Sequence, residues 1–134
     1  MSQENVGIAR SIYAAWERGD FSSADWADPG IETVIADGPA PGRSTGVSGA
    51  AELWGNFLNA WEGYRSQAEE YRELDDERVL VLISRTGRGK RSGIELGEIA
   101  SEGAVLYHIQ GGRVTRQVVY VDRANAFADL GLEE

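Results

Sequence analysis

The amino-acid sequence predicts an α+β fold in which N-terminal helices pack against a curved, mostly antiparallel sheet. Helical periodicity dominates the first 61 residues, whereas from residue 64 onward apolar residues alternate as they do in strands. The stretch 104–122 reads as two extended runs joined at Gly111-Gly112, where the missing Cβ atoms allow positive φ angles. Helices that come first and antiparallel strands that follow are typical of this fold class.

The first half of the chain is expected to begin with a helix, because Ile8, Ile12 and Trp16 recur at helical spacing after the capping residues 2–5. The other elements expected in this half are a short helical segment over 20–26, a strand over 31–36, a loop over 37–46 and a helix over 50–61. The loop holds three glycines and two of the three prolines. The last helix carries an aromatic stripe, which is a large apolar surface to bury.

The second half is expected to be a run of strands closed by a helix. Strands are predicted over 66–74, 78–86 and 94–99, with a flexible basic loop over 87–93, a bulge or break near 100–103 and a terminal helix over 124–132. In the hairpin, Val105, Tyr107 and Ile109 share one face, and Leu106 and His108 lie on the other. Neither face is polar, so each must be covered, by helices or a cavity on one side and often by a second subunit on the other.

The composition narrows the classes of function. The 134 residues suffice for one domain with a real core, and we expect a single domain over 1–134. The net charge of −9 argues against nucleic-acid and anionic-membrane partners. The absence of cysteine excludes disulfides and thiolate chemistry, and the single histidine, His108, excludes a histidine-rich metal site. We expect neither a metal nor a cofactor.

Targeting segments are not evident in the sequence. No apolar run approaches the length of a membrane span, and the N-terminus lacks the apolar core of a signal peptide. A cytoplasmic protein without a membrane partner is the expectation.

Three stretches of the chain occur together in one known family. They are a first helix that ends in WERGD, a loop that closes at Gly46 before a helix, and GGRVTR followed by VYVDR near the end. With the ending 122–131, they resemble the SnoaL-like branch of the nuclear-transport-factor-2-like superfamily over nearly the whole chain. The resemblance implies a cone, in which a strongly bent, barrel-like sheet wraps around the first helix and encloses a pocket, commonly in a homodimer. The superfamily hosts isomerases, cyclases, epoxide hydrolases, dehydratases and non-enzymes, so the resemblance is specific for fold rather than for activity.

Within such a cone, period-2 alternation predicts which side chains face the pocket. The expected pocket wall consists of Ile12, Trp16, Trp54 and Phe57 from the helices, with Val81, Ile83, Arg85, Val105, Tyr107, Ile109, Gln117, Val119 and Val121 from the strands. An apolar wall with few polar groups is the usual form of a small-molecule site. We therefore expect the partner to be a small hydrophobic molecule that carries oxygen.

The catalytic sets that the resemblance implies are incomplete in this chain. SnoaL-type cyclases pair an aspartate on the last strand with a histidine on the preceding one, and those positions are Val119 and Val105 here. Against ketosteroid isomerase, Asp37 fits the base position approximately, but Ile12 occupies the tyrosine position and Val105 that of the aspartic acid. Arg85 could serve as the arginine of the limonene-epoxide-hydrolase pattern, but no inward carboxylate beside it is assured.

Four polar residues remain candidates, each with a plain structural alternative. Asp37 is either a desolvated general base at the pocket mouth or a solvated residue that caps its own turn. Arg85 either binds a ligand carboxylate or enolate from inside the pocket, or reaches solvent at the strand end. Tyr107 and Gln117 either bind a ligand oxygen or are satisfied by the backbone.

The leading interpretation is a pocket protein that binds a small apolar, oxygenated molecule. If it is an enzyme, it performs cofactor-free isomerisation, cyclisation or hydration, in which Asp37 moves the proton and Arg85, Tyr107 or Gln117 stabilises developing negative charge. The alternative is a non-catalytic binding or dimerisation module whose cavity is filled by side chains. A protein-interaction scaffold is a third possibility, and it would require an exposed apolar patch.

A homodimer is expected from the resemblance, and three apolar residues on the outward face of the hairpin support it, namely Leu106, Val118 and Tyr120. His108 lies on the same face, where we expect packing or an interface role rather than catalysis. Asp122 and Arg123 are expected to form a charge pair at the strand end.

Overall fold

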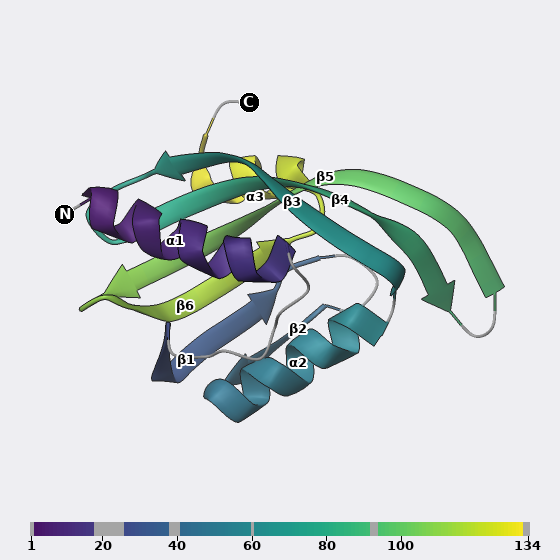
Figure 1. Cartoon of the computed structure of the whole chain (residues 1–134), viewed down its shortest axis with the longest axis horizontal. Coiled ribbons are helices and arrows are strands. Elements are labelled where there is room, and N and C mark those ends of the chain that lie inside the picture. Colours follow the sequence, from purple (N-terminus) through teal and green to yellow (C-terminus); the bar gives the residue numbers. More distant parts are fainter. Residues whose placement is uncertain (1, 18–25, 38–40, 60, 92–93, 133–134) are drawn as a thin grey trace.

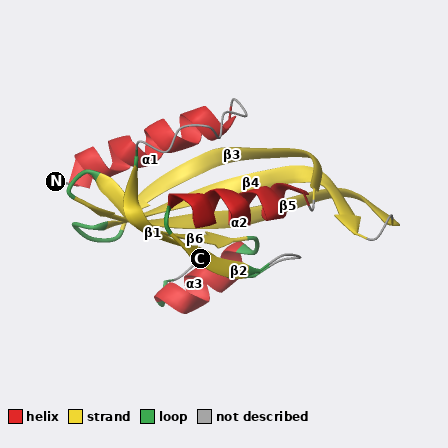
Figure 2. Cartoon of the chain, turned by 90° about the horizontal axis from the view of Figure 1, so that it is seen from below, coloured by secondary structure: helices red, strands yellow, loops and turns green. Residues whose placement is uncertain are grey.

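The computed structural model describes residues 2–17, 26–37, 41–59, 61–91 and 94–132. In chain order, its elements are α1 (Ser2–Glu17), β1 (Ala27–Ile35), β2 (Gly42–Thr45), α2 (Val47–Asn59), β3 (Trp61–Glu73), β4 (Arg78–Arg91), β5 (Ile94–Gln110), β6 (Arg113–Tyr120) and α3 (Arg123–Leu130). A curved sheet runs through the middle of the molecule, with α1 on one face and α3 on the other (Figure 1 and Figure 2). This arrangement confirms the predicted α+β class. Among these residues, no helix is both long and apolar enough to cross a membrane.

The strands of the described chain form one sheet in the order β2-β1-β6-β5-β4-β3. Neighbours run antiparallel except β1 and β6, which are parallel, with Ile35 opposite Val119. The β4–β5 hairpin extends beyond β6, because β5 pairs with β4 from Ile94 onward but with β6 only from Ala104 (Figure 1). The sheet is therefore mostly antiparallel, as predicted, and it does not close on itself.

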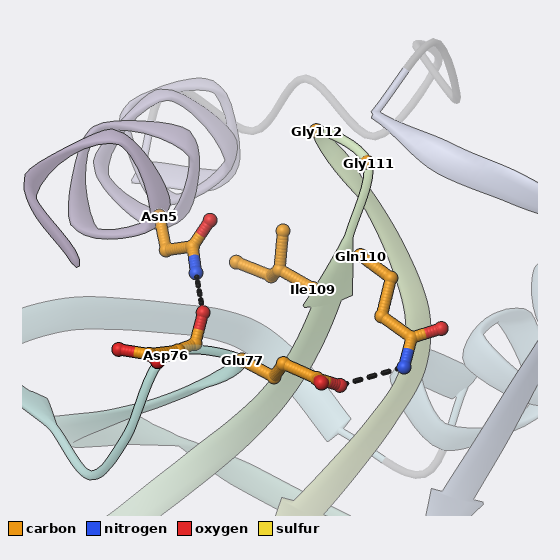
Figure 3. A pocket seen from close by; sticks show the side chains of 7 residues that line it. All are labelled: Asn5, Asp76, Glu77, Ile109, Gln110, Gly111 and Gly112. Carbon is orange, nitrogen blue, oxygen red and sulfur yellow. Dashed lines mark hydrogen bonds between the residues drawn. The ribbon is translucent and has the colours of Figure 1, made fainter. Parts of the chain in front are cut away.

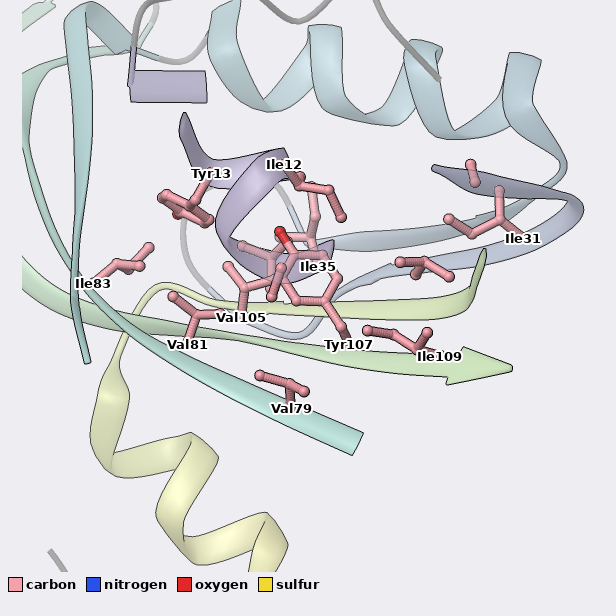
Figure 4. Packing of buried hydrophobic residues seen from close by; sticks show 14 residues of the cluster. Ile12, Tyr13, Ile31, Ile35, Val79, Val81, Ile83, Val105, Tyr107 and Ile109 are labelled. Atoms are coloured by element: carbon pink, nitrogen blue, oxygen red, sulfur yellow. The ribbon is translucent and has the colours of Figure 1, made fainter. Parts of the chain in front are cut away.

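The face of the sheet that carries α1, which we call the inner face, holds the larger apolar core (Figure 4). Its members are Ala9, Ile12, Tyr13, Ala27, Ile31, Ile35, Val79, Val81, Ile83, Val105, Tyr107, Ile109, Val114 and Val119. Four of them, Val81, Val105, Val119 and Ile35, lie opposite one another across four adjacent strands. Leu53 of α2 packs against the same core. The alternation predicted for β4, β5 and β6 is confirmed by this clustering.

The opposite, outer face carries a second apolar cluster, which α3 covers. It consists of Leu80, Leu82, Ala104, Leu106, Val118 and Tyr120 from the sheet with Ala126 and Phe127 from α3. The side chain of Asp122 caps the start of α3, and Gly131 ends the helix in the left-handed conformation, with φ 67°. Leu106, Val118 and Tyr120, which were expected to face a second subunit, are thus buried within one chain. They are no longer evidence for a dimer.

Two segments at the start of the sheet differ from the prediction. The loop expected over 37–46 contains β2, a four-residue strand that pairs with β1. β1 itself begins at Ala27 rather than at 31, with an irregular register between Ala27 and Glu32. Both segments contain glycine or proline, which interrupt the alternation of apolar and polar residues by which strands are predicted. The short helix expected over 20–26 lies almost entirely outside the described residues.

The β4–β5 hairpin is longer than the sequence indicated. The loop expected over 87–93 and the break expected near 100–103 are wrong for the described residues, because both strands continue through these positions. Residues of opposite charge are paired in the register of this hairpin, with Arg88 opposite Glu98. Such cross-strand pairs support strands in which few residues are apolar.

Candidate functional site

A row of polar side chains crosses the otherwise apolar inner face. Thr33 on β1 lies opposite Gln117 on β6, and Gln117 lies opposite Tyr107 on β5. All three are buried, and the ring of Tyr107 rises from β5 into the core beside Ile35 (Figure 4). Polar groups buried in an apolar core impose hydrogen-bonding requirements on whatever occupies it.

The side-chain amide of Gln117 is held at one end only. Its Nε2 donates to the Thr33 Oγ1 at 3.1 Å. Its Oε1 is buried and has no hydrogen-bond partner in the described part of the chain, although the residue is only 5% exposed. An unsatisfied buried acceptor costs about 1–3 kcal/mol, and native structures contain few of them. A ligand or an ordered water is the ordinary way to satisfy such an atom.

Arg85 lies further along the inner face, where its side chain lies over Gly103 of the neighbouring strand β5. The residue is 1% exposed, and its Nη1 donates to the carbonyl oxygens of Tyr120 at 2.8 Å and Val121 at 3.3 Å. Gly103 leaves the room for this side chain, because a Cβ there would lie 1.9 Å from Nη1. The inward orientation predicted from alternation is confirmed, and the solvent-facing alternative is excluded.

A second polar contact links the first helix to the edge of the sheet. The Tyr13 hydroxyl and the Ser66 Oγ are 2.7 Å apart, and Ser66 lies opposite Arg85 in the β3–β4 register. Tyr13 belongs to the inner core, so this bond fixes α1 on β3 from the interior. A hydroxyl pair therefore lies beside the β4 position that carries the buried Arg85.

Asp37 follows the end of β1 and joins it to the start of α3. Its Oδ1 accepts from the Val121 N–H at 2.6 Å, and its Oδ2 accepts from the Asp122 N–H at 3.0 Å and the Asn125 Nδ2 at 2.7 Å. Both carboxylate oxygens are therefore occupied by donors from distant parts of the sequence. A general-base role for Asp37 stays a prediction.

The neighbouring charged residues do not pair with each other as expected. Arg123 binds Glu69 and Glu102, with 3.0 Å between its Nη1 and the Glu102 Oε2, and it also donates to the Ile83 carbonyl. Asp122 instead caps α3. The predicted Asp122–Arg123 pair is wrong, because the helix start uses the carboxylate and the adjoining strands supply the partners of the guanidinium.

A separate hollow of about 530 Å³ lies where the β5–β6 turn approaches the first turns of α1 (Figure 3). Its lining consists of Asn5, Asp76, Glu77, Ile109, Gln110, Gly111 and Gly112. The amides that line it are already bonded, with Asn5 Nδ2 donating to the Asp76 carbonyl and Gln110 Nε2 to the Glu77 carboxylate. In the residues that the structure covers, no group of three or more acids and histidines could hold a metal ion. Ile109 is the one residue shared with the pocket wall expected from the sequence.

Solved structures supply the comparison that identifies the fold; no family model and no curated protein matches the sequence. TerC, co-crystallised with polyporic acid, superimposes with a TM-score of 0.74 at 21% identity, over 95% of this chain and 97% of that one. A provisionally assigned SnoaL-like polyketide cyclase from Jannaschia sp. CCS1 gives 0.74 at 13% identity, over 99% and 95%. An NTF2-like protein of unknown function from Burkholderia pseudomallei K96243 gives 0.74 at 17%, over 93% and 95%.

The chain has the SnoaL-like, nuclear-transport-factor-2-like fold. The fold that the sequence resemblance implied is thereby confirmed. The two positions that the resemblance assigns to the cyclase aspartate and histidine are Val119 and Val105 in this chain. They lie directly opposite each other in the β5–β6 register and are fully buried. A valine pair can neither accept nor donate a proton, so cyclase chemistry of that type is absent from these two positions.

The structure brings most of the predicted wall residues together. Ile12, Val81, Ile83, Val105, Tyr107, Ile109 and Val119 belong to the inner core, Arg85 and Gln117 are buried, and Val121 packs against the core. The side chains of Trp16, Trp54 and Phe57 lie outside the described residues. Thr33 was missed, although its alternation with Ile31 and Ile35 placed it on the same face.

His108 lies on the outer face, as alternation predicted. Its register neighbours are Arg78 on β4 and Arg116 on β6. Burial, followed by the positive charges of Arg116 and Arg78, lowers the pKa of His108 below its ordinary value. A neutral imidazole on the far side of the sheet from the polar row takes no part in the inner-face site.

Proposed function

We propose that this protein binds a small, largely apolar, oxygenated molecule against the inner face of the sheet, within a single domain. The observation that carries the proposal is the buried acceptor of Gln117, set in a polar row on an otherwise apolar surface. An apolar wall with a few placed polar groups is how proteins recognise such molecules. The crystal structure of TerC supports the proposal, because that protein has the same fold and was co-crystallised with polyporic acid.

Catalysis would be the finer form of this proposal. It would be cofactor-free isomerisation, cyclisation or hydration, with Asp37 as the base and with Arg85 stabilising negative charge. In support of it, Arg85 is buried on the inner face and Asp37 stands at the end of a strand that borders it. Against it, the contacts that both side chains make to the backbone are those of structural residues.

A second candidate is a non-catalytic binding or dimerisation module with a filled interior. The buried pair Val105 and Val119 favours it. The resemblance assigns catalytic residues to these two positions in cyclases, whereas here both side chains pack in the core. In either form we propose a cytoplasmic protein and a homodimer. With the outer apolar cluster covered by α3, the partner would contact another surface.

The binding proposal is tested by a saturation-transfer NMR screen with 2-naphthol, 2-methoxynaphthalene, glucose and AMP. We expect saturable binding of the aromatic compounds alone. Trp54→Ala should weaken it about tenfold by removing a predicted wall aromatic. Val47→Ala, at an exposed position on the same helix, should leave it unchanged. If neither aromatic compound binds, the proposal fails and the filled interior is the better account.

A further inference from the structure

The geometry of Gln117 restricts what can bind beside it. Because Nε2 is engaged by Thr33 at 3.1 Å, the amide is fixed with its carbonyl oxygen as the free end. Thr33 is itself fully buried on β1, so the amide cannot turn toward solvent. The group that meets Oε1 must therefore be a hydrogen-bond donor, since two acceptors repel each other.

The surroundings also restrict the charge of that donor. The strand that carries Gln117 contributes Val114 and Val119 to the inner core, and the only buried charge in the described inner face is the guanidinium of Arg85. An ammonium donor would enter without a carboxylate and on the same face as that positive charge, which is costly at low dielectric. An ionised phenol or carboxylic acid has no proton to donate. A neutral donor remains, and for the oxygenated ligand of the proposed function that donor is an O–H group.

We infer that the molecule bound on the inner face carries a neutral hydroxyl of the phenol or enol type, which donates to the Gln117 Oε1, and that Gln117 selects hydroxylated ligands over those that lack the hydroxyl. This inference rests on the proposed function and adds the chemical class of its ligand. In the free protein, water satisfies Oε1, and the ligand hydroxyl replaces that water. A ligand that displaces the water without donating leaves the acceptor unpaired and binds more weakly.

The test compares two probes of nearly the same shape by isothermal titration calorimetry. In the wild type, 2-naphthol should bind about tenfold more tightly than 2-methoxynaphthalene, which accepts but cannot donate. Gln117→Met keeps the length of the side chain and removes both polar ends. It should lower the affinity for 2-naphthol about tenfold and leave that for 2-methoxynaphthalene within about twofold. The matched control is Gln67→Met, at an exposed position on β3, which should keep the wild-type preference.

The possible outcomes distinguish a failure of this inference from a failure of the proposed ligand-binding function. Equal affinities for the two probes in the wild type overturn the inference and leave the proposed function standing. A preference for 2-methoxynaphthalene also overturns it, because the amide would then present its N–H groups. If neither probe binds, both fail. If Gln117→Met does not fold, Thr33→Val serves instead, since an amide that is no longer fixed should lose most of the preference.

Discussion

Gly103→Ala is expected to lower the free energy of unfolding by about 3–5 kcal/mol. The new Cβ would lie 1.9 Å from the Arg85 Nη1 and 2.6 Å from the Tyr120 carbonyl oxygen. The first contact forces a buried guanidinium away from its acceptors. The second involves backbone of the neighbouring strand, which moves only if the β5–β6 pairing is distorted. Neither the guanidinium nor the carbonyl can move without a loss of stability. The expected destabilisation is therefore large for the addition of a single methyl group.

Urea unfolding followed by circular dichroism measures this difference, with Gly7→Ala as the matched control. Gly7 is exposed within α1, and a Cβ there meets no atom within 4 Å. Alanine should stabilise that helix by about 0.5–1 kcal/mol. A Gly103→Ala protein as stable as the wild type would contradict the placement of Arg85 over this strand.

Asp37→Asn is expected to lower the free energy of unfolding by about 2 kcal/mol. The carboxylate accepts three hydrogen bonds that tie the end of β1 to Val121, Asp122 and Asn125. An asparagine side chain presents one N–H₂ group, which must face at least one of these donors. The variant therefore loses charge-assisted bonds and gains a donor–donor contact.

The matched control for this substitution is Asp28→Asn, since Asp28 accepts a local hydrogen bond from the Gly30 N–H near the exposed start of β1. Its stability should stay within about 0.5 kcal/mol of the wild type. Thermal unfolding of the two variants side by side gives the comparison. An Asp37→Asn protein with wild-type stability would show that the junction does not depend on this carboxylate, and would favour its assignment as a general base.

The sequence was informative wherever structure follows from neighbouring residues. Gly111 and Gly112 adopt the positive φ angles expected of the turn, at 60° and 80°. Alternation placed Val105 and Tyr107 on one face and Leu106 on the other, because the period of a strand is fixed by its backbone. The overall fold followed from these local signals together with the family resemblance.

The candidate site depended on contacts that alternation cannot supply. Gln117 and Thr33 are 84 residues apart, and so are Val121 and Asp37. Both pairs form where β1 lies beside β6. These two strands pair in parallel, and no local sequence pattern predicts that pairing. The role of Gly103 could not be predicted either, because the side chain that needs its space, Arg85, belongs to the neighbouring strand. Candidate site residues could therefore be predicted from the sequence, but the residues that they contact could not.

The central claim is that the inner face binds a small molecule, and amide chemical-shift mapping tests it most directly. The measurement is a ¹H–¹⁵N NMR titration of the wild-type protein with 2-naphthol. We predict saturable shifts centred on Thr33, Tyr107 and Gln117, including the side-chain N–H₂ of Gln117. Shifts confined to the hollow near Asn5 and Gly112, or no saturable shifts, would contradict the claim.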